Sequence, residues 1–73
     1  MIPDLRGTDS VVEHLVAGCT ITATKGSTRC AVRNPRGVLV AHAHRRTLEV
    51  ATQSGRVVRH WSPGAPTTWS LPT

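Results

Sequence analysis

Arginine is the residue type in this sequence that is best suited to binding a ligand. Eight of the nine basic residues are arginines, and Lys25 is the only lysine. Apolar and polar residues alternate over residues 28–33, and residues 38–43 predict the next strand. A four-residue turn between them would place arginines and histidines on one face of the predicted sheet. A guanidinium donates hydrogen bonds in a planar fork that matches two phosphate oxygens. The sequence therefore predicts a cationic face formed by Lys25, Arg29, Arg33, His42, His44, Arg45 and Arg46.

Two histidines of this face come closest to acid–base chemistry. Such chemistry needs a side chain that titrates near neutral pH and a second group that stabilises the developing charge. His42 with Arg29 would supply that pair, but the sequence shows no base paired with His42. We therefore expect His42 and His44 to lie at an exposed, solvated end of a strand. We assign no catalytic residue, and His42 is the only candidate for one.

The residues that could ligate a metal do not have the spacing of a metal site. Zinc ligands usually pair with two to five residues between them. Ten residues separate Cys19 from Cys30, eleven separate Cys30 from His42, and one separates His42 from His44. We expect no metal and no cofactor, and we expect both cysteines to be small core residues.

Size and composition favour a binding surface over a deep active site. The chain has 73 residues, 38% of them hydrophobic, with neither Phe nor Tyr. Its core is therefore thin, since a single core of this size rarely supplies more than about 3–5 kcal/mol. The formal net charge of +5 makes a polyanion the first partner to consider.

No segment of the sequence predicts a membrane protein. The first residues lack the basic start and apolar run of a signal peptide. No apolar stretch approaches the roughly 20 residues that span a bilayer. We expect a cytoplasmic protein whose two cysteines stay reduced.

A helix is predicted over residues 10–17. Ser10 and Glu13 have the S-x-x-E spacing of a capping box. Apolar residues then recur at positions i, i+3 and i+4, and Gly18 is typical of the residue that follows a helix. Because the helix is short, it is stable only if its apolar stripe packs against another element.

Two alternating segments after the helix predict an antiparallel hairpin. Residues 19–24 and 28–33 flank the turn Lys25-Gly26-Ser27. If Gly26 and Ser27 are the central residues of a type II′ turn, Ile21 lies opposite Val32 and the apolar side chains share one face. A slip of one residue would bury the arginines, so this register is the one expected.

The segments after this hairpin leave alternatives open. Residues 34–37 fit a type I turn, and residues 38–43 predict a third strand. A bulge would reverse which of its side chains face the core. Residues 47–61 fit either a short helix closed by Gly55 or two strands on either side of that glycine. Periodicity alone favours the two strands.

The last residues, 62–73, contain three prolines and no charge. This composition predicts an extended arm that follows a single domain over residues 1–61. Trp69 and Leu71 are two positions apart and can face the same side of an extended chain. With Trp61, they are candidate anchors that hold the arm on its own domain or on a partner.

The order of these motifs resembles the small HicA-type (YcfA-like) mRNA interferase toxins over about residues 10–55. The resemblance is carried by a helix end, two turns and the start and end of a second helix, namely Ala17-Gly18, Lys25-Gly26-Ser27, Asn34-Pro35-Arg36-Gly37, Thr47-Leu48 and Gln53-Ser54-Gly55. It implies an α-β-β-β-α fold similar to a double-stranded-RNA-binding domain. It therefore favours a helix over residues 47–54.

The catalytic position of that family differs in this sequence. The family's catalytic His directly follows Gly-Ser, whereas Thr28 stands at that position and Arg29 at the next. A threonine hydroxyl does not titrate near neutral pH and cannot act as a general acid or base there. The resemblance therefore implies a relative without the nuclease activity.

Together these features predict an α+β domain with a helix, a three-stranded antiparallel sheet, a short second helix or two further strands, and an extended C-terminal tail. The function expected first is non-catalytic binding of the RNA or DNA backbone through the arginine face. A second hypothesis is an inhibitor, encoded by a phage or another mobile element, that docks on an acidic host protein. A third is a divergent HicA-like ribonuclease toxin that uses His42. Strand edges left open by a small sheet would allow a homodimer.

Overall fold

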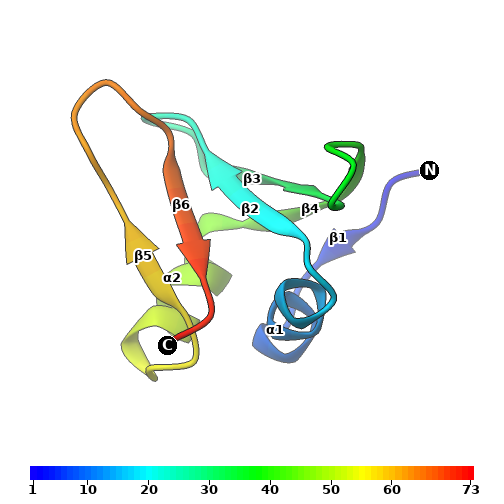
Figure 1. Ribbon diagram of the computed structural model, residues 1–73, viewed down its shortest axis with the longest axis horizontal. Helices are drawn as coiled ribbons and strands as arrows, with labels where there is room; N and C mark the ends of the chain where they lie inside the picture. The colour runs from blue at the N-terminus through cyan, green and yellow to red at the C-terminus, as the bar shows by residue number, and fades with distance from the viewer.

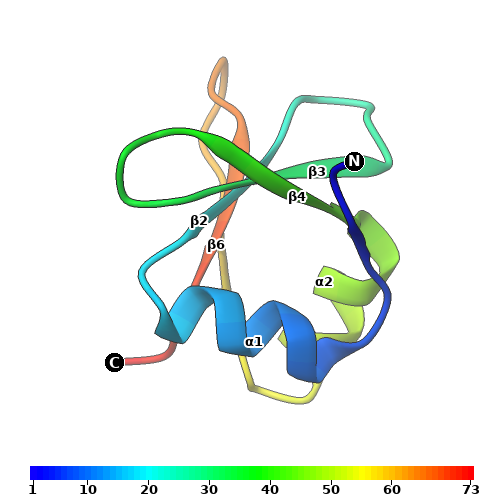
Figure 2. The same ribbon diagram turned by 90° about the vertical axis from the view of Figure 1, so that its right-hand side faces the viewer.

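The computed structural model describes residues 1–73 as a twisted, six-stranded sheet with two helices packed on one face (Figures 1 and 2). The strand order is β1-β4-β3-β2-β6-β5, with β1 parallel to β4 and every other pair antiparallel. The α+β class is thus confirmed. The elements are β1 (Asp4–Leu5), α1 (Thr8–Val16), β2 (Thr20–Ala23), β3 (Arg29–Arg33), β4 (Leu39–His44), α2 (Arg45–Gln53), β5 (Val58–His60) and β6 (Thr67–Ser70).

The first helix begins earlier than the capping box predicts. The N-cap residue is Gly7, which makes no side-chain cap, and Ser10 lies inside the first turn. A distant residue contacts the start of this helix. Arg56 donates hydrogen bonds to the hydroxyl of Thr8 and the carboxylate of Asp9, at 3.1 and 2.6 Å. The sequence pattern alone could not reveal this contact, because its partners are more than forty positions apart.

The β2–β3 hairpin has the predicted register although its turn differs. Ile21 lies opposite Val32, and both are fully buried. The N–H of Ser27 donates to the carbonyl of Thr24, so Lys25 and Gly26 occupy the centre of the turn, with Gly26 at a φ of 79°. Burial of the apolar face therefore sets the register more firmly than the turn does.

The β3–β4 hairpin contains a bulge, but the bulge lies close to the turn. The register shifts between Val32 and Arg33, and beyond that point Val32 pairs with Ala41. Ala41 and Ala43 are buried, while His42 between them points to the other face. The bulge therefore does not reverse which side chains face the core, and Ala41 and Ala43 lie on the core side of the sheet.

The segment from 45 to 60 combines both of its predicted alternatives. It contains a helix, α2, which ends before Gly55 at a φ of 79°. The N-cap is His44, whose Nδ1 accepts a hydrogen bond from the backbone N–H of Arg46 at 3.2 Å. The segment after Gly55 forms a strand as well, β5.

The expected three-stranded sheet is an under-count, and the segment expected to be an extended arm contains a strand, β6. This strand lies between β2 and β5, inside the sheet, where Trp69 pairs with Ile21. Trp69 is 2% exposed, and Leu71 packs against the core, whereas Trp61 is 68% exposed. In a chain without Phe or Tyr, the Trp69 ring is the largest apolar group available to bury. The prolines of the segment lie outside the strand, where they cost no ladder hydrogen bond.

The core lies between the helices and the inner face of the sheet. Val11 and Leu15 of α1 and Leu48 and Ala51 of α2 pack on the buried residues of β2, β3, β4 and β6. Both cysteines are free thiols. No helix has the length and apolar composition needed to cross a membrane.

Candidate nucleic-acid interface

Most of the positive charge of this protein is not neutralised by a carboxylate. The structure contains one salt bridge, between Arg56 and Asp9. The other seven arginines and Lys25 have no carboxylate oxygen within 4.0 Å. These cations can therefore contact an anionic ligand without first breaking an ion pair.

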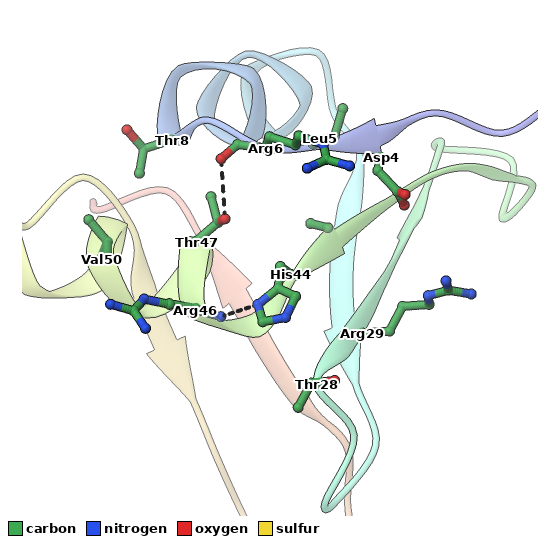
Figure 3. Close-up of a pocket in the computed structure, with 11 residues that line it drawn as sticks. Asp4, Leu5, Arg6, Thr8, Thr28, Arg29, His44, Arg46, Thr47 and Val50 are labelled. Atoms are coloured by element: carbon green, nitrogen blue, oxygen red, sulfur yellow. Dashed lines mark hydrogen bonds between the residues drawn. The ribbon is translucent and has the colours of Figure 1, made fainter.

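Three arginines and a histidine gather at a hollow of about 630 Å³ where β1, β4 and α2 meet (Figure 3). We call it the basic hollow and define it by Arg6, Arg29, His44 and Arg46. His44 ends β4 and caps α2, and Arg29 lies opposite it in the β3–β4 ladder. The hydroxyl of Thr47 donates to the carbonyl of Arg6 at 3.4 Å, which ties the β1–α1 connection to α2. Three separate segments of the chain thus supply the cations.

The cations of the basic hollow are spread out rather than directed at one point. In Figure 3 the side chains of Arg29 and Arg46 lie on opposite sides of His44. Nδ1 of His44 accepts the cap hydrogen bond, so a neutral imidazole carries its proton on Nε2 and can donate from there. Asp4 is the only carboxylate that lines the hollow. This arrangement suits an extended polyanion better than a single small anion.

A second depression lies between the β2–β3 turn and the β5–β6 loop, with a volume of about 1030 Å³. We call it the hairpin groove and define it by Lys25, Arg45, Arg59 and Trp61. No carboxylate lines it. Figures 1 and 2 show the two hairpin tips at the end of the molecule away from α1. Thr28 lines both depressions, so the groove adjoins the basic hollow.

Arg45 also has a structural role in the hairpin groove. Its Nε donates to the carbonyl of Ser27 at 2.9 Å, and its Nη2 donates to the carbonyl of Thr24 at 3.4 Å. The guanidinium lies over the ring of Trp69. These contacts use two of the five N–H donors of the side chain, and the remaining donors can reach a ligand.

Two residues of the predicted cationic face lie outside both depressions. Arg33 donates to the carbonyl of Gly37 at 3.1 Å, at the far end of β3. His42 is half-buried on the outer face of the sheet, opposite Ala31. The register places His44, not His42, opposite Arg29. The structure therefore brings together Arg29, His44 and Arg46, and separately Lys25 and Arg45.

Sequence reasoning missed Arg6 and Arg59. Arg6 reaches the basic hollow because β1 pairs with β4, and a strand of two residues leaves no alternating pattern. Arg59 lies in β5, a segment that the sequence offered as a strand over residues 56–61 in one of its two alternatives. The sequence analysis proposes Trp61 as an anchor of the C-terminal arm and does not place it beside Lys25 and Arg45 in a groove.

The thiols and histidines are scattered in this structure. No three His, Cys, Asp or Glu side chains lie together as ligands for a metal ion. Burial raises the pKa of the Cys30 thiol to about 11, although the nearby charge of Arg45 acts to lower it. A thiol with this pKa stays protonated at neutral pH and is a poor nucleophile.

No family model, no curated protein and no solved structure matches this chain.

Proposed function

We propose that this protein is a small, non-catalytic module that binds the phosphate backbone of nucleic acid through the basic hollow. The observation that carries the proposal is the arrangement of Arg6, Arg29 and Arg46. None of them is paired with a carboxylate, and they come from three segments around one hollow. Phosphates of a polynucleotide recur along a chain, so spread cations can each contact a different phosphate.

The side chain at the position of the family's catalytic His supports binding without cleavage. Thr28 stands at that position if the HicA-type resemblance holds, and it lines the basic hollow. A hydroxyl can donate to a phosphate oxygen, but it does not titrate near neutral pH. We therefore propose that this surface holds a nucleic acid and leaves it intact.

The proposal is tested by fluorescence anisotropy of a labelled oligonucleotide at several salt concentrations. R29A and R46A are the test variants. R36A is the matched control, because Arg36 is also exposed but lies in the β3–β4 turn, at the other end of β3. Each test variant should weaken binding and reduce the slope of log affinity against log salt by about 0.7 for each phosphate of a single strand that the variant no longer binds.

The same experiment can contradict the proposal in two ways. In the first, R36A weakens binding as much as R29A does. In the second, the wild-type protein does not bind the oligonucleotide at low salt. In the second case an acidic protein surface becomes the better candidate partner, since it would use the same unpaired arginines.

A further inference from the structure

Trp61 is a large apolar ring that the fold leaves uncovered. It follows directly after β5 and is 68% exposed, whereas Trp69 is 2% exposed. Burial of an aromatic side chain is worth roughly 1.5–3 kcal/mol, so an exposed indole forgoes a contribution that matters in a thin core. An exposed ring of this size in a depression is typical of a binding residue.

The surroundings of Trp61 are positively charged. The hairpin groove is lined by Lys25, Arg45 and Arg59 together with Trp61, and by no carboxylate. Lys25 and Arg59 form no salt bridge, and no hydrogen bond occupies their side chains. Arg59 lies opposite Trp69 in the β5–β6 ladder, so the pairing with β6 fixes the backbone position of Arg59.

One aromatic face beside several cations is the combination that unpaired nucleotides need. A base stacks on an indole ring irrespective of its sequence, and the neighbouring cations neutralise the phosphates. In a duplex the faces of the bases are already stacked on one another, so a side chain that stacks reaches only unpaired bases. The chain has no Phe or Tyr and Trp69 is buried, so Trp61 is the only exposed ring larger than an imidazole that can supply this contact.

We propose that the hairpin groove binds an unpaired segment of RNA or DNA, with one base stacked on Trp61 and the adjacent phosphates bound by Lys25, Arg59 and the free donors of Arg45. This inference rests on the proposed nucleic-acid binding and adds the class of ligand, single strand over duplex. Thr28 lines both the groove and the basic hollow. A strand can therefore continue from the stacked base to the arginines of the hollow.

Tryptophan fluorescence gives a direct test, because the chain has two tryptophans and only Trp61 is exposed. The full-length protein is titrated with a short single-stranded oligonucleotide and with the duplex of the same sequence. The single strand should quench the emission of the wild-type protein, and W61F, which keeps only Trp69 as a fluorophore, should lose that quenching. W61A should bind the single strand about tenfold more weakly and the duplex with unchanged affinity.

A comparison of W61F with W61L separates stacking from general apolar contact. W61F should retain most of the affinity, because a phenyl ring still stacks, whereas W61L should behave like W61A. V58A is the matched control, since Val58 is also exposed and lies in β5, but it does not line the groove.

The outcomes distinguish this inference from the proposed function. If W61A binds the single strand as tightly as the wild type while R29A still weakens binding, the inference is wrong and the proposed function stands. The same holds if quenching persists in W61F. If neither oligonucleotide binds the wild-type protein at low salt, the proposed function fails and the inference fails with it.

Discussion

The guanidinium of Arg45 lies over the ring of Trp69, 5.6 Å from its centroid. This contact joins the first residue of α2 to the strand formed by the C-terminal segment. The hydrogen bonds from Arg45 to Ser27 and Thr24 connect the β2–β3 turn to the same point. One arginine thus holds together three parts of the chain that form the hairpin groove.

Replacement of Arg45 should therefore lower stability as well as binding. R45A removes two hydrogen bonds to carbonyl groups and a cation–π contact, and we expect a loss of about 2 kcal/mol in the free energy of unfolding. R45K should lose less, because an ammonium keeps the charge over the ring but cannot form the same fork. Urea unfolding monitored by circular dichroism measures the free energy of unfolding of both variants. Equal stability of R45A and the wild type would contradict the structural role of Arg45.

The two tryptophans should differ sharply in their contribution to the fold. W69A removes the largest buried ring and should cost about 3–5 kcal/mol, which is comparable to the whole stability expected for a domain of this size. W61A is the matched control and should change the thermal midpoint little, since its ring is exposed. Thermal melts of both variants test this. A folded W69A with a midpoint close to that of W61A would mean that β6 is not part of the core.

Trp69 also carries a cost that a smaller ring would not. Its indole N–H is buried and has no hydrogen-bond partner. A buried donor without a partner costs about 1–3 kcal/mol. W69F removes this donor and keeps much of the ring, so it should be clearly more stable than W69A in the same melts.

The buried Cys30 thiol should make stability fall in alkaline solution. Burial raises its pKa from 9.0 to about 11 in the folded protein. Between these two values the unfolded chain loses the thiol proton while the folded chain keeps it. Stability is therefore unaffected by this group below pH 9 and declines by up to about 1.4 kcal/mol per pH unit between pH 9 and 11.

C30A isolates the contribution of this thiol. Alanine leaves a small cavity, so the variant should be less stable than the wild type at neutral pH. Its stability should nevertheless fall less steeply between pH 9 and 11, and the difference between the two slopes measures the thiol. Parallel slopes would show that Cys30 ionises equally in the folded and unfolded states.

Local patterns in the sequence predicted the elements whose partners are close along the chain. The alternation on both sides of Lys25 and Gly26 set the register of β2 and β3, because a slip would have buried Arg29. The family resemblance favours a helix over residues 47–54, although periodicity favours strands, and the structure has a helix at Arg45–Gln53. The prediction that Ser10 caps the first helix is wrong, since the N-cap is Gly7 and Ser10 lies inside the helix, where Arg56 contacts Thr8 from 48 positions away.

Long-range pairing accounts for most of what the sequence did not reveal. β1 has two residues and pairs with a strand about forty positions away, and β6 pairs with both β2 and β5. A Pro-rich composition around β6 favoured an arm, whereas burial of Trp69 decides in favour of a strand. The site shows the same division. The sequence predicts Arg29 and Arg46 as cations of one surface, whereas Arg6 reaches the basic hollow through the pairing of β1 with β4, and Arg59 reaches the hairpin groove through the pairing of β5 with β6.

The measurement that tests the account most directly is an NMR titration of the isotopically labelled protein with a single-stranded oligonucleotide at low salt. Binding at the proposed surface should shift the backbone resonances of Thr28, Arg29 and Arg46 and the indole resonance of Trp61. The indole resonance of Trp69 and the backbone resonances of residues 12–16 in α1, which line neither depression, should move little. Shifts confined to the outer face of the sheet around Thr20 and Arg33, or no shifts at all, would contradict nucleic-acid binding through the basic hollow and the hairpin groove.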